Sequence, residues 1–356
     1  MDFGLVLGYW GTDPDINLDL TVEAEKLGFH SVWTAEAYGT DAFTPLAWIA
    51  AHTKHIKLGT AVAQIPARTP AMTAMTVTTL DMLSEGRVLL GLGVSGPQVV
   101  EGWHGVPFGK PVAKMREYIL ILQAMIQREN HVSFEGEFFQ LPYVGEDATG
   151  LGRPLKLIHH PVRNEIPIYL GAMGPKNVAL AAEVAQGWFP HLLSPDHFES
   201  QYRNSIEEGF AINESKNNYE NFDIIAQVYV RAGDDLQACR LAEKQRLALI
   251  LGGYGARTKN FYVNTVSRYG YGKACDQIQD LFLKGQKEEA VQAIPDELID
   301  DITLVGSRDN IKKQLVRWEK AGIKRIAAWT NQTEALKILA DLAGPEMQAR
   351  AALVVS

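Results

Sequence analysis

The sequence has few features that would tie the chain to a membrane, to nucleic acid or to an oxidising compartment. It has only two cysteines, Cys239 and Cys275, which argues against a disulfide framework and against a thiolate metal site. No apolar run approaches membrane-spanning length, and Asp2 stands where a secretory signal would carry positive charge. The formal net charge of -8 disfavours binding to nucleic acid or anionic lipid. We therefore expect a cytoplasmic protein that acts on small molecules.

The sequence also lacks the usual signs of metal or covalent chemistry. The close histidine pairs, His52 with His55 and His159 with His160, have no third ligand at metal spacing, so we expect no metal site. There is no nucleophile elbow and no Ser-His-Asp order. A bound cofactor that carries the reaction would fit these absences.

Short runs rich in Val, Ile and Leu alternate with amphipathic stretches of helical length. This alternation is typical of βα units around a parallel sheet. We therefore predict one domain over residues 1–356, folded as a (β/α)8 TIM barrel, with an open doubly wound sheet as the alternative. The expected strands are Phe3–Gly8, Ser31–Glu36, Ile56–Ala63, Val88–Val94, Ile166–Ala172, Gly187–Leu192, Asp223–Arg231 and Arg325–Thr330. The expected helices are Leu18–Leu27, Ala42–Thr53, Thr69–Leu83, Lys114–Arg128, Pro175–Gln186, Pro195–Phe210, Asp235–Leu251 and Arg308–Ala321, the last with Ser307 as N-cap.

Two connections are too long to be simple loops, and we read them as insertions after strands four and seven. The first, about 95–165, contains a helix and then VSFEGEFFQL, whose alternation around Gly136 predicts a β-hairpin beside the barrel. The second, about 232–305, contains several helices with glycines between them. Segments that follow barrel strands lie at the face that carries the active site, so both insertions are candidate lids.

The expected strand exits are small, aromatic or amide-bearing, which suits a flat, neutral ring system. The turn LGAMGPKN, with Lys176 and Asn177 at a helix start, is a candidate phosphate site, although such a turn is common in barrels. GLGVSGPQ matches the dinucleotide pattern G-x-G-x-x-G, but two of its glycines, Gly91 and Gly93, fall inside the strand. We interpret this run instead as a strand of small residues that lets a planar ring approach the backbone.

Three ionisable residues near the strand exits are candidates for chemistry. Glu36 would be a carboxylate in an apolar barrel mouth, so a ligand N–H group or a nearby cation should pair with it. His104 and Glu101 lie in the loop after strand four, and either could exchange a proton with a substrate. The alternative for His104 is a structural hydrogen bond.

Four stretches of the sequence resemble the bacterial luciferase-like monooxygenase superfamily and, within it, the branch of oxidoreductases that use the deazaflavin coenzyme F420. The resemblance extends over about residues 3–332, and the C-terminal VGSRDNIKKQLVRWEKAGIKRIAAWT is similar to the family's closing helix and strand. The stretches are VWTAEAYG, LGTAVAQIPARTPA, TLDMLSEGRVLLGLGVSGPQVVEGWHG and IPIYLGAMGPKNVALAAEVAQGWFP.

The resemblance implies a set of cofactor-binding residues. Glu36 matches a residue beside the cofactor, and the residues at the strand-three bulge match the position of a non-prolyl cis peptide in several deazaflavin enzymes. The acidic tail of a deazaflavin would need basic partners, for which Arg68 and Lys176 are candidates. The matching positions are Ala61 and Val62 at the bulge, Ser95, Gly96 and Gln98 in the loop after strand four, and Met173, Gly174 and Asn177 on the phosphate side.

The resemblance leaves three functions open. The first is an F420-dependent oxidoreductase that moves hydride to or from a small organic substrate; Ala37 stands where the family's sugar-phosphate dehydrogenases have histidine, so that activity is not expected. The second is an FMN-dependent monooxygenase that uses O2, and the third is a non-catalytic flavin-binding barrel. Members of the family often pair through helices two and three, and the apolar stretch Ala71–Leu83 would permit a homodimer.

Overall fold

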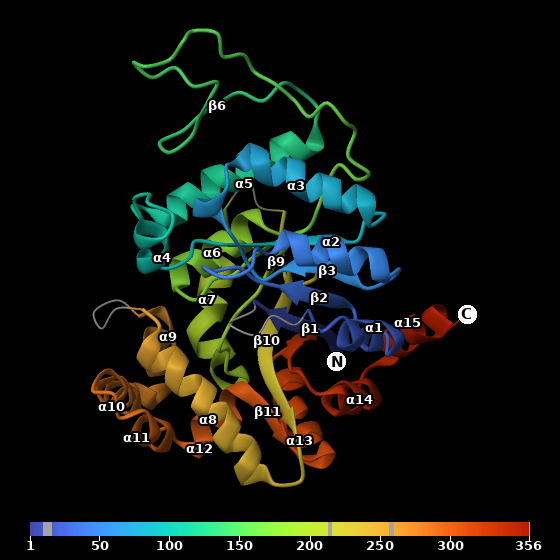
Figure 1. Ribbon diagram of the computed structural model, residues 1–356, viewed down its shortest axis with the longest axis vertical. Coiled ribbons are helices and arrows are strands. Elements are labelled where there is room, and N and C mark those ends of the chain that lie inside the picture. Colours follow the sequence, from blue (N-terminus) through green and yellow to red (C-terminus); the bar gives the residue numbers. More distant parts are fainter. Residues whose placement is uncertain (10–15, 213–215, 256–259, 356) are drawn as a thin grey trace.

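Eight parallel strands form a closed barrel. The computed structural model describes residues 1–9, 16–212, 216–255 and 260–355. In order around the ring the strands are β1 (Asp2–Gly8), β2 (Ser31–Thr34), β3 (Lys57–Thr60), β5 (Val88–Gly93), β8 (Ile168–Leu170), β9 (Gly187–Trp188), β10 (Asp223–Ala232) and β12 (Arg325–Trp329). The ring closes because β12 pairs with both β10 and β1. All eight expected strands are present, and the (β/α)8 prediction is confirmed (Figure 1).

Two further strands join this ring. β4 (Ala63–Gln64) follows β3 after two irregular residues and pairs with the end of β5. β11 (Thr303–Gly306) pairs with the C-terminal part of β10, outside the barrel. The sequence analysis missed β11 because four buried residues between two helices do not show an alternating pattern.

The barrel interior is filled by side chains from nearly every strand. One buried cluster contains Trp33 from β2, Tyr169 from β8 and Ile225 from β10, together with residues of β1, β5 and β12 and the residue that follows β9. In β3, Gly59 faces this cluster, and an added Cβ would lie 2.1 Å from Cε3 of Trp33. The indole therefore occupies the space that a β3 side chain would fill, and the interior is a packed core below the site. The other members are Val6, Leu89, Phe189 and Ala327.

Helices cover the outside of the barrel, and several begin at a residue that caps them. The Thr69 hydroxyl accepts a hydrogen bond from the N–H of Met72 at 3.1 Å, and Ser307 accepts one from Asn310 at 3.4 Å, which confirms the predicted N-cap. The helices of the outer layer are α1 (Leu18–Lys26), α2 (Phe43–His52), α3 (Pro70–Leu83), α5 (Pro111–Gln127), α6 (Pro175–Val184), α7 (Phe198–Phe210), α13 (Arg308–Lys320), α14 (Thr333–Asp341) and α15 (Pro345–Val355), with short 3-10 turns η1 (Ile65–Ala67) and η2 (Pro195–His197).

The first insertion contains the predicted hairpin, but the hairpin does not cover the barrel mouth. β6 (Phe134–Glu135) and β7 (Gln140–Leu141) pair antiparallel outside the helix layer, beyond α5 (Figure 1). The Glu117 carboxylate of α5 accepts hydrogen bonds from the N–H groups of Glu137 and Phe138 at 2.7 and 2.9 Å. These bonds hold the hairpin turn on α5, so the lid expectation fails for this part. Only the short helix α4 (Pro97–Gly102) lies on the side where the strands end.

The second insertion is a helical subassembly, and its first helix packs against the end of β10. Three charged residues make this connection: Glu243 of α8 pairs with Arg231 of β10 at 2.9 Å and with Arg246 of α8 at 3.1 Å. The insertion reaches the mouth of the barrel through α9 (Figure 1). Its elements are α8 (Leu236–Gly253), α9 (Phe261–Val266), the π-helical turn η3 (Ser267–Tyr271), α10 (Gly272–Leu283), α11 (Lys287–Gln292) and α12 (Asp296–Ile302).

Three further features bear on the sequence analysis. Within the described ranges, no helix combines the length and the apolar character that a membrane span requires. The same ranges contain no group of three His, Cys, Asp or Glu residues that could hold a metal ion. Cys239 and Cys275 are both buried free thiols.

Candidate active site

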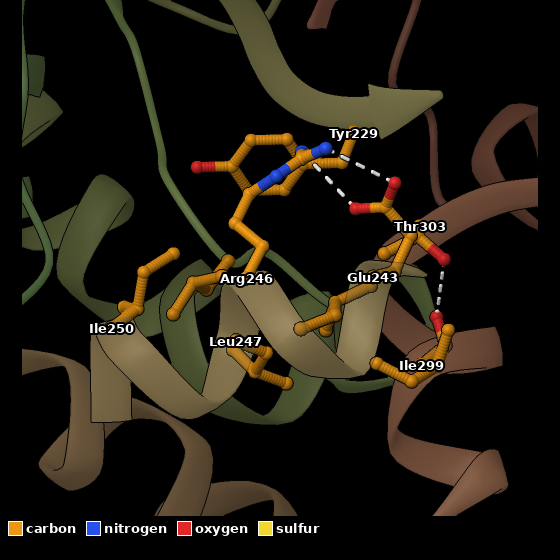
Figure 2. A pocket seen from close by; sticks show the side chains of 9 residues that line it. Tyr229, Glu243, Arg246, Leu247, Ile250, Ile299 and Thr303 are labelled. Carbon is orange, nitrogen blue, oxygen red and sulfur yellow. Dashed lines mark hydrogen bonds and ion pairs between the residues drawn. The ribbon is translucent and has the colours of Figure 1, made fainter. Parts of the chain in front are cut away.

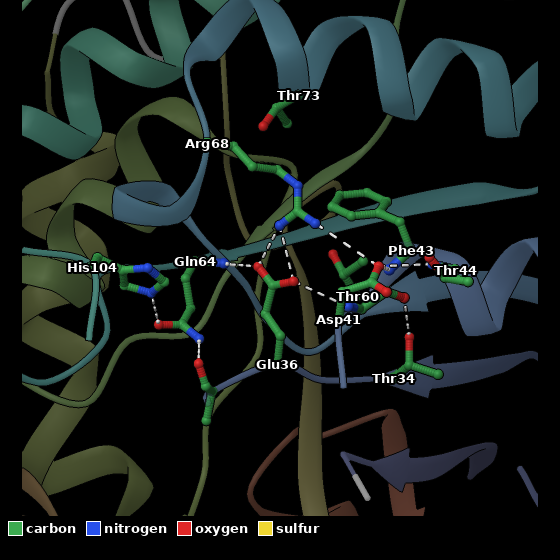
Figure 3. A network of polar contacts seen from close by, with 12 residues as sticks. Thr34, Glu36, Asp41, Phe43, Thr44, Thr60, Gln64, Arg68, Thr73 and His104 are labelled. Carbon is green, nitrogen blue, oxygen red and sulfur yellow. Dashed lines mark hydrogen bonds and ion pairs between the residues drawn. The ribbon is translucent and has the colours of Figure 1, made fainter. Parts of the chain in front are cut away.

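The Glu36 carboxylate is the centre of a buried polar network at the ends of β2 and β4 (Figure 3). Only 6% of its side chain is exposed. Nη1 of Arg68 donates to both carboxylate oxygens at 2.8 and 2.9 Å. The backbone N–H groups of Gln64 and Ala42 also donate to it, at 2.9 and 3.0 Å. The expected partner of Glu36 is therefore a protein cation, and its carboxylate is already saturated with hydrogen bonds.

Arg68 is held in place from several directions. Its guanidinium lies 4.8 Å from the ring centroid of Phe43 and 3.8 Å from the Asp41 carboxylate. Its carbonyl oxygen accepts a hydrogen bond from the Tyr118 hydroxyl at 3.3 Å. Arg68 is thus already paired with Glu36. Nothing in this arrangement supports the expectation that Arg68 binds an acidic cofactor tail.

The network continues to His104 through the side chain of Gln64. Nε2 of Gln64 donates to the carbonyl oxygen of Ala37 at 2.8 Å, which fixes the orientation of the amide. Nε2 of His104 lies 3.3 Å from Oε1 of Gln64. An amide oxygen only accepts hydrogen bonds, so this ring nitrogen carries the hydrogen. The structure therefore joins Glu36 and His104 through one intervening residue.

Glu101 does not join this network. Its side chain is exposed, and it accepts a weak hydrogen bond from the N–H of Phe108 at 3.4 Å. No hydrogen bond joins Glu101 to His104 among the described residues. A role for Glu101 in proton transfer gains no support from this geometry.

Val62 forms a shelf at the bulge between β3 and β4. The peptide bond between Ala61 and Val62 is cis, as the resemblance implies. An added Cβ would lie 2.3 Å from Cγ2 of Val62 at Gly93 and 2.8 Å from Cγ1 at Gly171. At Gly91 it would lie 1.8 Å from a backbone oxygen of β3. The glycines of GLGVSG therefore admit the bulge and its valine, and they do not form a dinucleotide turn.

Open space lies beside this shelf at the exits of β5 and β8. An added Cβ at Gly174 meets no atom within 4 Å, and at Gly96 it meets only Oε1 of Gln98 at 3.8 Å. Ser95, just before Gly96, has a left-handed φ of 61°, which is uncommon for a residue with a side chain. The cofactor loop after β5 and the start of α6 after β8 thus each have free space at a glycine.

The phosphate-side segment is contacted by an arginine from the second insertion. Nη2 of Arg268 donates to the carbonyl oxygen of Met173 at 2.9 Å, directly before Gly174 and the start of α6. Its Nε is buried without a hydrogen-bond partner, and no carboxylate in the described ranges pairs with it. Asn177 lies in the first turn of α6, with its N–H bonded to the carbonyl oxygen of Gly174 at 3.0 Å. The sequence analysis missed Arg268 because nothing in the sequence connects η3 with β8.

The opposite side of the mouth is lined by aromatic rings. We call the network around Glu36, Gln64, Arg68 and His104 the polar side. The aromatic side consists of residues from the ends of β1, β9, β10 and β12 and from the second insertion: Tyr9, His191, Tyr229, Tyr254, Tyr262 and Trp329. Sequence reasoning missed this group because each aromatic residue, taken alone, looks like a core residue. Their positions at strand exits were the available signal.

A recess at the other end of the barrel is lined by residues that contribute to stability. It has a volume of about 790 Å³ and is lined in part by Asp2, Asp223 and Arg325. Arg325 pairs there with both carboxylates, at the N-terminal ends of the strands. In this fold, that end carries stability and the opposite end carries chemistry. We therefore place the active site at the mouth.

Comparison with known proteins identifies the family to which the chain belongs. The chain is 48% identical, over 96% of its length and 99% of the relative's, to a Mycobacterium tuberculosis protein provisionally named a coenzyme F420-dependent oxidoreductase. It is 28% identical, over 86% of each chain, to the 5,10-methylenetetrahydromethanopterin reductase of Archaeoglobus fulgidus. The structure of the F420-dependent tetrahydromethanopterin reductase from Methanopyrus kandleri superposes with a TM-score of 0.80 at 23% identity, covering 97% of this chain and 99% of that one. The luciferase-like monooxygenase family model matches residues 4–325, and the chain therefore belongs to this family.

Proposed function

We propose that the protein is an oxidoreductase that uses coenzyme F420 to move hydride to or from a small organic substrate. The observation that carries the proposal is the Val62 shelf, with its three facing glycines, together with the free space around Gly96 and Gly174 at the exits of β5 and β8. A shelf of this kind suits the face of a flat ring. The Mycobacterium tuberculosis relative named for F420 matches 96% of the chain, which favours the deazaflavin over FMN.

The residues beside the open space also fit the phosphate of such a cofactor. The helix α6 begins after Gly174 with Pro175, so the backbone N–H of Lys176 lies at the positive end of the helix dipole, while the N–H of Asn177 is bonded to Gly174. Arg268 adds a guanidinium with an unused N–H group at the same place. Met173, Gly174 and Asn177 would thus hold the phosphate, together with Arg268.

The chain's own residues would orient the cofactor and handle protons. The bound deazaflavin supplies a carbon that accepts or donates hydride. Glu36 positions Gln64 and Arg68 and is itself too fully bonded to act as a base. His104 is the candidate proton donor or acceptor of the polar side, because its Nε2 is oriented by Gln64 and its ring is only partly buried.

Two other functions make different predictions. An FMN-dependent monooxygenase would bind FMN at the same shelf and consume O2 when the flavin is reduced. A non-catalytic flavin-binding barrel would retain its flavin without turnover on any donor.

A fluorescence titration of the purified protein with F420 and with FMN, in the same low-salt buffer, tests the proposal. We expect F420 to bind at micromolar concentration and FMN to bind much more weakly. The reverse order would favour the monooxygenase, and O2 consumption with reduced FMN would establish it. Binding of neither would overturn the assignment of the site.

We also propose that two copies of the chain pair through α2 and α3. The exposed residues of α3 are uncharged, and its one charged residue, Asp81, is 1% exposed. On α2, Trp48 is 54% exposed. Copies that each carry a net charge of -8 repel one another, so an uncharged face is where they can approach. The exposed side chains of the face are Thr44, Ala47, Trp48, Ala51 and His52 of α2 and Met72, Met75, Thr79, Met82 and Leu83 of α3.

The segment that follows the hairpin and contains Leu151, Leu155 and Ile158 extends this face. Nε2 of His159 bonds to the Thr78 hydroxyl at 3.0 Å, and Arg163 pairs with Asp81 at 2.5 Å, so the segment is fixed on α3. It nevertheless exposes 96% of Ile158. Leu151 and Leu155 are also largely exposed.

Sedimentation velocity tests the pairing. We expect the wild-type protein to sediment as a dimer and Met75→Glu to sediment as a monomer, while both bind F420. Lys312→Glu, an exposed change on α13, is the control and should leave the dimer intact. A monomeric wild-type protein would contradict the proposal.

A further inference from the structure

The aromatic side of the mouth has an ordered arrangement around one ring. The Tyr229 ring is stacked on Trp329, with centroids 4.9 Å apart and planes at 30°, and the Arg246 guanidinium lies 3.9 Å from its centroid. The residual cavity behind Tyr229 measures about 10 Å³, which is no more than the space of one water molecule (Figure 2). The ring is therefore fixed by its surroundings and cannot swing aside.

His191 stands edge-on between this ring and the second insertion. Its centroid lies 5.7 Å from that of Tyr229 and 5.7 Å from that of Tyr262, at interplanar angles of 63° and 70°. The next residue, Leu192, has a left-handed φ of 56° and is buried. Non-glycine residues in this conformation often mark functional positions. Two aromatic contacts and an unusual turn thus define the direction of the imidazole.

The imidazole has an unused hydrogen-bonding atom. Nε2 of His191 is buried and has no hydrogen-bond partner among the described residues. A buried polar atom without a partner costs free energy, and native proteins rarely tolerate it without a use. Burial, aided by the charge of Arg246, lowers the pKa of His191 to about 4, so the ring is neutral at physiological pH.

Among the residues that the structure describes on this side, none offers an unpaired charge to an ionic ligand. The Arg246 guanidinium is paired with Glu243 of its own helix. The Tyr9 and Tyr254 hydroxyls bond to each other at 3.1 Å, and burial raises the pKa of Tyr9 and raises the pKa of Tyr262 to about 12, so both phenols stay neutral. The side therefore suits an apolar body with one neutral hydrogen-bonding group.

We propose that the aromatic side is the substrate subsite, that it selects an uncharged, apolar substrate bearing a hydroxyl or carbonyl group, and that His191 Nε2 is the hydrogen-bond partner of that oxygen. The proposal rests on the proposed function, because a carbon–oxygen centre beside the cofactor can donate or accept hydride. When the substrate is an alcohol, its C–H bond breaks and the hydride reduces the oxidised deazaflavin. The O–H proton passes to His104, the candidate proton acceptor of the polar side, and a carbonyl product remains.

The test is a binding measurement on the enzyme loaded with oxidised F420, with histidines labelled by ¹⁵N. Cyclohexanol is the probe, and methylcyclohexane and cyclohexanecarboxylate are its comparisons. The His191 ring signal is assigned from its absence in His191→Phe. We expect cyclohexanol to shift this signal, methylcyclohexane to leave it in place, and the carboxylate not to bind.

Two variants separate a hydrogen bond from packing. We expect the cyclohexanol dissociation constant to rise about tenfold in His191→Phe and by less than about threefold in His191→Gln, which keeps a polar group. Equal weakening in both variants, or failure of cyclohexanol to bind or to shift the His191 signal, would overturn the inference. F420 binding by the two variants should equal that of the wild type. Failure of the wild type to bind F420 would instead overturn the proposed function.

Discussion

The two sides of the barrel mouth are fixed by different forces. The polar side is held by an ion pair and charge-assisted hydrogen bonds around Glu36 and Arg68. The aromatic side is held by ring contacts around Tyr229, and Nε2 of His191 has no hydrogen-bond partner among the described residues. The hydrogen-bonding groups of the polar side are already used, so this side can orient a cofactor but cannot form new hydrogen bonds to a ligand. The aromatic side still has an unused hydrogen-bonding atom. The difference indicates that positioning belongs to the polar side and substrate recognition to the aromatic side.

Breaking the central ion pair of the polar side should have the largest effect. Arg68→Met leaves the buried Glu36 carboxylate without its cation, and we expect the free energy of unfolding to fall by about 3–5 kcal/mol. Urea unfolding measures this change. The double variant Glu36→Gln with Arg68→Met removes both charges and should recover most of the loss. A double variant as unstable as the single one would show that the unpaired charge of Glu36 is not the cause of the lost stability.

On the aromatic side, acidic pH should lower the stability of the fold because His191 becomes protonated on unfolding. Its folded pKa of about 4 lies below the ordinary value of 6.5, so the unfolded chain binds a proton first as the pH falls. This contribution to stability is complete above pH 6.5 and is lost as the pH falls towards 4. We expect a loss of about 2 kcal/mol, reduced from the full shift because the side chain is partly exposed.

Unfolding measured between pH 7 and pH 4 on the wild type and on His191→Phe tests this dependence. The variant should lose less stability across that range. The buried His30, whose pKa is also lowered by burial, is present in both proteins and cancels. Changing the exposed His131 to Asn is the control and should leave the pH profile unchanged. Parallel profiles for His191→Phe and wild type would contradict the assignment.

The Val62 shelf offers a steric test of the cofactor position. In Gly93→Ala the new Cβ would lie 2.3 Å from Cγ2 of Val62, so the shelf must move. We expect F420 affinity to fall about tenfold. Gly102→Ala, whose Cβ meets nothing within 4 Å, is the matched control. Equal F420 affinity in both variants would place the ring away from Val62.

The smallest effect is expected at His104. His104→Phe removes one hydrogen bond to Gln64 and leaves the Glu36–Arg68 pair intact. We expect F420 affinity to fall by no more than about threefold, with a larger loss in turnover if His104 exchanges the substrate proton. Single-turnover kinetics at saturating F420 distinguish the two effects. An unchanged rate would leave His104 with a structural role.

The sequence was sufficient to predict the barrel. It did not predict that the mouth has a polar side and an aromatic side. The apolar runs of the eight strands are local patterns, and so they could be read directly. The pairing of Glu36 with Arg68 joins positions 32 residues apart, and the contact of Arg268 with Met173 joins positions 95 apart. Such contacts depend on where loops turn after their strands. The hairpin was predicted correctly as an element, but its place on α5 depends on Glu117, whose role no local pattern indicates.

The most direct test of the account is a crystal structure of the protein with oxidised F420 bound. We predict that the deazaflavin ring lies against Val62, that its phosphate lies near Gly174 and Arg268, and that the rings around His191 stay uncovered. A deazaflavin ring placed between His191 and Trp329 would contradict the account, because the aromatic side would then hold the cofactor.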